Sequence, residues 1–310
     1  MEDRHYRTFN PGACFRNVSL ICINIVVNSD LYMIGKIKLI AMDLDGTTLQ
    51  KDHESFSPRL LRVLDEAERE GIHILPVTGR PWEMRPQVLQ NRYPWSERIV
   101  CANGAEERDL RDGTVLRRYA IDAATVERLI QSARDIGALE IHQNGHQYIS
   151  AGDYQKEAAA HPGPWYHGDR VLKDFGIIVQ DLEEQIRKDP AGIVKASWFC
   201  FDDNSCRRAR EILAQLRVSA AETAPGGFEI GCPEANKYLG IQRVCRELGL
   251  DPAEAAYLGD SENDRSVFGR VGISVAMGNA PQGLKKIADL VADNYDDDGA
   301  AKAIEQLMKQ

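Results

Sequence analysis

The chain has 310 residues, 43% of them hydrophobic, which is enough to build roughly two domains with separate cores. Its 38 lysines and arginines stand against 47 aspartates and glutamates, so the formal net charge is −9. This negative balance argues against a broad binding surface for nucleic acid or for an anionic membrane. A small anionic ligand remains compatible with it, because one positive pocket is enough to bind such a ligand.

Seven cysteines are scattered along the chain without a Cys-x-x-Cys pair. This predicts free thiols in a reducing compartment, and therefore a cytoplasmic protein. The N-terminal segment contains an apolar run at 18–27, but about ten residues are too few to span a bilayer. Because Met33 lies just before the first predicted strand, we expect residues 1–34 to be an N-terminal extension outside the fold, with a weak signal peptide as the alternative.

The first predicted strand, 37–42, leads directly into the sequence Asp43-Leu44-Asp45-Gly46-Thr47-Thr48. A short, mostly aliphatic run bounded by a glycine turn is typical of a strand buried in a parallel sheet, and such sheets bind ligands at the carboxyl ends of their strands. Two carboxylates there can share one crevice, where one attacks as a nucleophile, the other transfers a proton and a hard cation offsets their repulsion. A polar exit from the strand is the alternative interpretation.

A second strand end carries groups that suit an anion. The strand predicted at 72–77 ends in Thr78-Gly79-Arg80. A hydroxyl and backbone N–H groups at this position can bind a phosphate oxygen, whereas a simple turn before Pro81 is the alternative. Between the two strands, a helix is expected from Ser57-Pro58 to Gly71.

From about residue 121 to residue 225 the pattern changes to a mixed α+β block. The Asn144-Gly145 pair between His142 and His146 predicts a hairpin turn, which we prefer to a zinc site. Segment 151–170 has no periodicity of its own, so we expect a loop that lines a substrate entrance or forms a surface insertion. In chain order the other elements expected here and just before are a strand at 98–101, a hairpin within 106–119, a helix at 122–137, a strand at 193–201 and a helix at 206–216.

The alternation of strands and helices returns near residue 227. Asn236 predicts the cap of a helix that begins at Lys237. A strand at 255–258 then ends in Gly259-Asp260-Ser261-Glu262-Asn263-Asp264, the second strand end that is rich in carboxylates. The remaining elements expected are an extended segment at 228–231, a strand at 273–277 and a helix at 300–308 whose start is capped by the acidic run 296–298.

Most of these motifs share one position, the carboxyl end of an apolar strand in an alternating α/β chain. In a parallel sheet such ends converge on one crevice, so residues that are distant in sequence can meet there. Several carboxylates with one lysine would repel one another without a cation, and ligands that offer only oxygen indicate Mg²⁺. The residues expected to meet are Asp43, Asp45, Thr78, Lys237, Asp260 and Asp264.

Together these motifs resemble the four signature motifs of the haloacid dehalogenase (HAD) superfamily of phosphatases. Asn103-Gly104-Ala105 and Met277-Gly278-Asn279-Ala280, with the large insertion before Lys237, resemble its Cof-type subfamily, which carries a C2-type cap. The resemblance covers residues 36–310. It implies an α/β fold in which a Rossmann-like, doubly wound parallel sheet core, at 35–120 and 226–310, carries an inserted α+β cap domain at 121–225.

The resemblance also implies a role for each motif residue. Asp43 would be the nucleophile that forms an aspartyl-phosphate, and Asp45 the general acid that protonates the leaving alcohol and then activates water. Mg²⁺ would be bound by Asp43, by the backbone carbonyl of Asp45 and by Asp260, with Asp264 in a supporting position. The groups that hold phosphate or substrate would be Thr78, Gly79, Lys237 and Asn263.

We therefore expect a Mg²⁺-dependent phosphatase that hydrolyses a small phosphorylated metabolite, with a sugar phosphate as the expected class and no nucleic-acid or membrane partner. A phosphomutase is the second enzyme hypothesis, because the same two aspartates can return the phosphoryl group to another hydroxyl. A non-catalytic protein that binds a phosphorylated metabolite is a hypothesis from a different class. One departure from the subfamily pattern is Tyr238 in place of a glycine, which leaves a solvent-facing position for Lys237 as an alternative.

Overall fold

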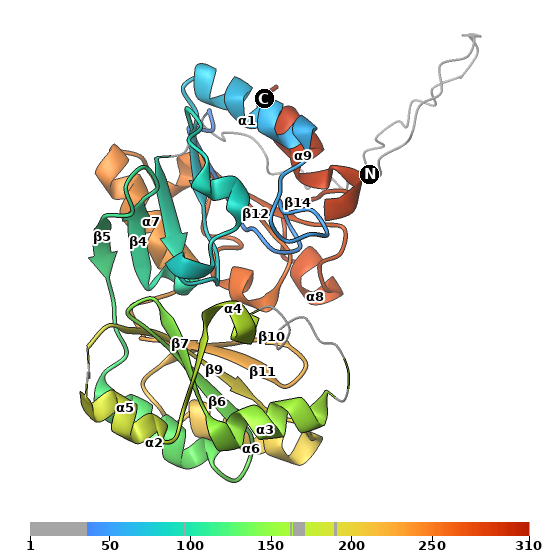
Figure 1. Ribbon diagram of the computed structural model, residues 1–310. Helices are drawn as coiled ribbons and strands as arrows, with labels where there is room; N and C mark the ends of the chain where they lie inside the picture. Colours follow the sequence, from blue (N-terminus) through green and yellow to red (C-terminus); the bar gives the residue numbers. More distant parts are fainter. Residues whose placement is uncertain (1–35, 96, 162, 164–170, 189–190, 310) are drawn as a thin grey trace, which may run out of the picture.

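The computed structural model describes residues 36–309 apart from residues 96, 162, 164–170 and 189–190. The extension expected at 1–34 therefore lies outside the described residues. Within them the chain forms two layered units, one above the other in Figure 1, each built around a β-sheet of its own. No helix in this described part is both long enough and apolar enough to cross a membrane.

The first unit is built on a parallel sheet of five strands in the order β14-β13-β12-β1-β2. An isolated parallel bridge between Val77 and Val100 connects this sheet to a three-stranded antiparallel sheet, β3-β4-β5. The strands predicted in this part of the chain are all present, and β14 is an additional strand that was not predicted. Among the described residues, the first unit therefore has the following eight strands. Their bounds are β1 (Leu39–Met42), β2 (His73–Pro76), β3 (Arg98–Cys101), β4 (Glu106–Asp109), β5 (Val115–Arg118), β12 (Ala255–Gly259), β13 (Ile273–Ala276) and β14 (Leu290–Val291).

Helices cover both faces of the parallel sheet, which explains why β1 is apolar at every position. Ile40 and Met42 pack in one core cluster with α1 and α9, whereas Leu39 and Ala41 pack in another with α7. The helices of this unit are α1 (Pro58–Arg69), α7 (Lys237–Leu248), α8 (Gln282–Lys285) and α9 (Gly299–Leu307). Short 3₁₀ turns lie between them, at η1 (Trp82–Met84), η2 (Gln87–Gln90), η3 (Ala102–Gly104), η5 (Pro252–Glu254), η6 (Glu262–Ser266) and η7 (Tyr295–Asp297).

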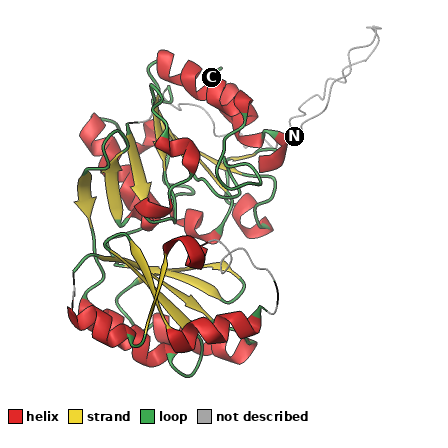
Figure 2. Ribbon diagram, in the orientation of Figure 1, coloured by secondary structure: helices red, strands yellow, loops and turns green. Residues whose placement is uncertain are grey.

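The second unit is a six-stranded sheet in the order β10-β11-β9-β6-β7-β8, which we call the cap sheet. Its longer helices lie on the face away from the first unit, so the other face of the sheet is turned towards the first unit (Figures 1 and 2). The strands are β6 (Ala138–Gln143), β7 (His146–Ser150), β8 (Gly176–Val179), β9 (Ile193–Phe199), β10 (Ser219–Ala224) and β11 (Gly227–Gly231). The helices are α2 (Ala123–Ala133), α3 (Ala151–Ala160), α4 (Lys173–Phe175), α5 (Leu182–Lys188) and α6 (Asp203–Leu213).

These two units confirm the predicted α/β fold with an α+β cap. The hairpin expected at Asn144-Gly145 is also present, because β6 and β7 pair in antiparallel fashion and both turn residues have positive φ, 46° and 87°. A turn that places two residues in the left-handed region favours asparagine and glycine there.

Segment 151–170 differs from the expected loop, because α3 occupies Ala151–Ala160. The Ser150 hydroxyl caps it by accepting a hydrogen bond from the backbone N–H of Asp153 (3.0 Å). The buried residue of this helix is Glu157, so α3 lacks the apolar stripe from which a helix can be recognised in a sequence. Most of 161–170, where a substrate entrance was considered, lies outside the described residues.

The expected boundary between the core and the cap needs correction. Strand β11 pairs with both β10 and β9, so the boundary expected at residue 226 would divide the cap sheet, whereas a boundary after Gly231 keeps it whole. The acidic run lies at the start of the last helix, as expected, because Asp298 is the N-cap residue of α9. The Asp298 side chain makes no cap hydrogen bond, and Asp296 pairs with Lys51 (2.7 Å).

Candidate active site

The motif residues come together at the carboxyl ends of β1, β2 and β12, where the first unit faces the cap sheet. Several of them line a cavity of ≈ 420 Å³ whose other wall is formed by cap strands, whereas Lys237 and Asp264 are fully buried beside it. From the first unit, the lining includes Asp43, Asp45, Thr78, Gly79, Asp260 and Asn263. From the cap sheet, it includes Lys195, Ser197 and Glu229. The distant strand ends therefore meet in one crevice, as the sequence pattern predicts.

Lys237 is the central cation of this crevice. It is the first residue of α7, whose N-cap Asn236 accepts a hydrogen bond from the backbone N–H of Leu239 (2.9 Å). Its side chain is fully buried, and Nζ donates to Asp43 Oδ1 (2.7 Å) and Asp264 Oδ1 (2.6 Å). Burial alone would lower the pKa of Lys237, but the two carboxylates outweigh it and raise this pKa above its usual range. The ammonium stays charged, and the alternative of a solvent-facing lysine is wrong.

Asp264 anchors this arrangement. Besides the bond from Lys237, its carboxylate accepts hydrogen bonds from the Tyr257 hydroxyl (2.5 Å) and from the backbone N–H groups of Asp260 and Ser261 (2.8 Å each). Burial, together with the nearby carboxylates, raises the pKa of Tyr257 well above its usual value, so the hydroxyl stays a donor. Since a carboxylate offers about four acceptor sites, these donors leave Asp264 little capacity to bind a metal directly.

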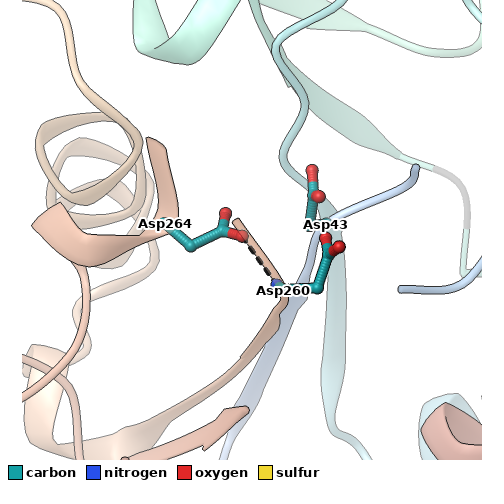
Figure 3. Close-up of side chains that lie close together, drawn as sticks. All are labelled: Asp43, Asp260 and Asp264. Carbon is teal, nitrogen blue, oxygen red and sulfur yellow. Dashed lines mark hydrogen bonds between the residues drawn. The ribbon is translucent and has the colours of Figure 1, made fainter. Parts of the chain in front are cut away.

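Asp43, Asp260 and Asp264 form an acidic cluster, which Figure 3 shows at the ends of β1 and β12. One carboxylate oxygen of each residue lies within 4.8 Å of the others. Gly46 lets the Asp260 side chain come close to the loop after β1, because its φ is +71° and a Cβ there would lie 2.3 Å from Asp260 Oδ2. Hard oxygen ligands at this spacing fit Mg²⁺, with Asp43 and Asp260 as carboxylate ligands and Asp264 as their support.

The acidic cluster is unfavourable without a cation. Burial, together with Asp264, raises the pKa of Asp260 to about 7, although Lys237 and a hydrogen bond from Thr47 Oγ1 (3.2 Å) oppose this shift. Burial also raises the pKa of Asp43 well above its usual value, although Lys237 opposes it. A divalent cation beside these carboxylates would favour their ionised forms, so the cluster is a favourable site for one.

Asp45 is not part of the acidic cluster, because its side chain points to Arg80 and His53. Arg80 donates to it through Nε (2.7 Å) and Nη2 (2.6 Å), and His53 Nδ1 lies 2.9 Å from Oδ1. Arg80 also donates to the backbone carbonyls of Met84 (3.1 Å) and His53 (3.2 Å), which ties their loops to the site. Burial would raise the pKa of Asp45, but the bonds from His53 and Arg80 outweigh it and hold this pKa below its usual range.

Of the residues predicted to hold phosphate, Thr78, Gly79 and Asn263 line the same cavity, whereas Lys237 is fully buried and does not line it. Thr78 is buried, and its hydroxyl accepts a hydrogen bond from the backbone N–H of Arg80 (3.0 Å). Asn263 Nδ2 donates to Asn103 Oδ1 (3.1 Å) and more weakly to Glu229 Oε2 (3.3 Å), which belongs to the cap sheet. Asn263 thus connects the first unit with the cap.

Sequence reasoning missed His53, which contacts Asp45, and three side chains on buried strands that contact other motif residues, namely Tyr257, Lys195 and Glu229. These three lie on β12, β9 and β11 respectively, among apolar neighbours. A single polar residue inside a buried strand needs a partner, because an unpaired polar group there is costly. An isolated polar residue in an apolar strand is therefore the signal that the sequence offered, but it does not show which residue is the partner.

Replacing Asp260 with Asn tests the electrostatics of the acidic cluster. Folding raises the pKa of Asp260 from 3.8 to about 7, so its ionisation destabilises the folded protein as the pH rises above 3.8. This destabilisation is complete at a pH above about 7. In a chelator at pH 8, Asp260→Asn should therefore raise the Tm by several degrees. Mg²⁺ should raise the Tm of the wild-type protein and have much less effect on the variant, as measured by calorimetry.

Asp135→Asn is the matched control, because Asp135 is exposed and lies in the cap region, outside the crevice. It should change neither the Tm nor the response to Mg²⁺. An equal rise in Tm with Mg²⁺ in the wild-type protein and in Asp260→Asn would contradict a metal site at Asp260.

A family model described as haloacid dehalogenase-like hydrolase matches residues 40–304. Among curated proteins, the chain is 27% identical over 272 residues to 5-amino-6-(5-phospho-D-ribitylamino)uracil phosphatase YcsE of Bacillus subtilis (strain 168), which covers 86% of this chain and 94% of that protein. It is 26% identical over 298 residues to phosphatase YwpJ of the same organism, which covers 87% of this chain and 100% of that protein.

Solved structures share the fold. A haloacid dehalogenase-like hydrolase from B. subtilis matches with a TM-score of 0.74 at 23% identity, over 87% of this chain and 100% of that chain. The HAD subclass IIB sugar phosphatase BT4131 matches with a TM-score of 0.71 at 21% identity, over 87% of this chain and 98% of that chain. Since the family model spans most of the sequence, the chain belongs to the haloacid dehalogenase-like hydrolases and, within the HAD superfamily, to the Cof-type phosphatases.

Proposed function

We propose that the protein is a Mg²⁺-dependent phosphatase that hydrolyses a small phosphorylated metabolite through an aspartyl-phosphate on Asp43. The observation that carries this proposal is the Asp43 carboxylate, bonded to the buried ammonium of Lys237 beside Asp260 in a cavity. A cavity of ≈ 420 Å³ suits a small metabolite. Curated relatives that are named phosphatases support the reaction class.

In the proposed first step, an Asp43 oxygen attacks phosphorus while the bond from phosphorus to the leaving-group oxygen breaks. Phosphoryl transfer depends mainly on in-line positioning and on neutralisation of charge. The 2.7 Å bond from Lys237 holds the Asp43 carboxylate in one orientation and offsets part of its charge. The phosphoryl oxygens would be bound by Thr78, Gly79, Lys237 and Asn263.

Asp45 would transfer the protons in both steps. It gives a proton to the leaving oxygen, and then takes one from the water that attacks phosphorus and frees Asp43. Its contacts with Arg80 and His53 favour the ionised form, which the second step needs. A phosphate dianion beside Asp45 raises its pKa by like-charge repulsion, so substrate binding promotes the protonated form that the first step needs.

Mg²⁺ would be held by Asp43, Asp260 and the backbone carbonyl of Asp45. Asp264 supports this set, because it accepts the backbone N–H of Asp260 (2.8 Å) and the Lys237 ammonium (2.6 Å). When bound, the ion supplies charge that stabilises the transferring phosphoryl group.

We propose a sugar phosphate or a related polyol phosphate as the substrate class, with no nucleic-acid or membrane partner. The polar side chains of the cap wall support it, since Lys195, Ser197 and Glu229 can all bond to hydroxyl groups. Two relatives support it by name, a ribitylaminouracil phosphate phosphatase and a sugar phosphatase. A reducing, cytoplasmic location agrees with the buried free thiols of the described cysteines, Cys101, Cys200, Cys206, Cys232 and Cys245.

Replacing the nucleophile tests the reaction directly. With p-nitrophenyl phosphate and Mg²⁺, Asp43→Asn should lower kcat by at least about 10⁴-fold, because an amide cannot form the covalent intermediate. Circular dichroism should show an unchanged fold. Activity within tenfold of the wild type would end the assignment of Asp43 as nucleophile.

Product analysis separates a phosphatase from the alternatives. With a hexose phosphate and Mg²⁺, we expect inorganic phosphate and free sugar in equal amounts, as followed by phosphorus NMR. An isomeric sugar phosphate in place of inorganic phosphate would favour a phosphomutase. Binding without turnover would favour a non-catalytic protein.

Tyr257→Phe tests whether the support behind Asp264 matters for the chemical step. The variant loses one donor to the buried Asp264 carboxylate, which should destabilise the protein by about 1–3 kcal/mol. Because Lys237 shares this carboxylate, we expect kcat to fall about tenfold with little change in KM. Tyr238→Phe is the control, since that hydroxyl only accepts a bond from Gln242 (3.2 Å). Unchanged kcat in Tyr257→Phe would show that this support is not needed.

A further inference from the structure

The cap sheet places one ion pair against the loop that follows β2. Lys195 lies on β9 and Glu229 on the adjacent strand β11, and the Lys195 ammonium pairs with Glu229 Oε1. The same ammonium donates to the backbone carbonyl of Gly79 (3.0 Å). The pair therefore belongs to the cap sheet but contacts residues 78–80, the loop that we propose binds phosphate and call the phosphate loop.

The second oxygen of Glu229 contacts the first unit as well. Oε2 accepts hydrogen bonds from Asn103 Nδ2 (2.8 Å) and, at a longer distance, from Asn263 Nδ2 (3.3 Å). A Cβ on Gly79 would lie only 2.8 Å from Oε2, so the glycine makes room for this carboxylate. Glu229 is thus held beside the phosphate loop by neighbours on both units.

Glu229 keeps its negative charge, and each group of the pair keeps capacity for one more hydrogen bond. Burial would raise the pKa of Glu229, but Lys195 and Asn103 outweigh it and lower this pKa. An ammonium has three N–H donors, and Lys195 uses two of them on Glu229 and Gly79. A carboxylate has about four acceptor sites, and Glu229 receives one bond each from Lys195, Asn103 and Asn263.

The spare donor and the spare acceptor belong to side chains that face substrate space. Lys195 and Glu229 both line the ≈ 420 Å³ cavity together with Asp43. Their side chains remain 8% and 18% exposed, so a ligand in the cavity can reach them. One donor beside one acceptor matches a hydroxyl group, which accepts one hydrogen bond and donates another.

We infer that Lys195 and Glu229 recognise a hydroxyl group on the carbon next to the phosphate ester of the substrate. The hydroxyl oxygen accepts from Lys195 Nζ, and its hydrogen is donated to Glu229. The position follows from Gly79, because the pair lies against the phosphate loop rather than deeper in the cap. This inference rests on the proposed function, and it restricts the substrate to phosphate esters of polyols and sugars with this neighbouring hydroxyl.

A matched pair of substrates tests the inference, namely ribitol 5-phosphate and 4-deoxyribitol 5-phosphate, which lacks the hydroxyl beside the ester. With Mg²⁺, the wild-type protein should prefer the hydroxylated ester in kcat/KM by about 10- to 100-fold, because the deoxy compound leaves a buried charged pair without its partner. In Lys195→Met and in Glu229→Gln, this ratio should fall to within about threefold of unity. Glu229→Gln keeps the shape of the side chain, so at least one variant is expected to fold.

Glu183→Gln is the control, because Glu183 lies on α5, outside the cavity, where it pairs with Arg134 at the end of α2 (2.7 Å). It should keep the wild-type preference for the hydroxylated ester.

If both variants lower kcat/KM for the two esters by the same factor, the pair only holds the cap in place and the inference is wrong. If the wild-type protein hydrolyses both esters equally well, the inference is wrong although the phosphatase function stands. If it hydrolyses neither ester nor p-nitrophenyl phosphate, the proposed function itself fails.

Discussion

The buried ammonium of Lys237 is the interaction on which the rest of the site depends. It connects the end of β1, through Asp43, with the turn after β12, through Asp264. A fully buried cation is tolerated only with such partners, and removing either one would leave an uncompensated charge. Asp264 also positions Asp260, because its carboxylate accepts a hydrogen bond from the Asp260 backbone N–H (2.8 Å). One lysine therefore sets the positions of the proposed nucleophile and of a proposed metal ligand.

The two units differ in the balance of charges that they place around the crevice. Lys237 alone does not neutralise Asp43, Asp260 and Asp264. Burial and the neighbouring Asp264 therefore still raise the pKa of Asp260, and a divalent cation would offset the remaining negative charge. On the opposite wall, the cap supplies the balanced pair of Lys195 and Glu229. In the proposed reaction, the first unit would supply the charges around the transferring phosphoryl group, and the cap would offer paired hydrogen-bonding groups to the leaving group.

The sequence was informative where local pattern and position coincide. Asp43 and Asp260 follow apolar strands, so a parallel sheet must bring them to the same edge, and Asn236 identified the start of α7 and hence Lys237. The contacts of Glu229 depend instead on the pairing of β11 with β9, which no local pattern encodes. Helix α3 was missed because it buries Glu157 rather than an apolar stripe, and Arg80 was noted without its partner Asp45.

We propose that the Asp43 carboxylate carries the phosphoryl group between two half-reactions, and the variant Asp45→Asn, assayed with p-nitrophenyl phosphate and Mg²⁺, provides the sharpest test. Nitrophenolate leaves without a proton, so the first step proceeds, whereas loss of the base slows the second. We expect a burst of nitrophenolate equal to the enzyme concentration, and mass spectrometry of the acid-quenched protein should find the phosphoryl group on Asp43. Turnover without a burst, or a phosphoryl group on another residue, would contradict the claim.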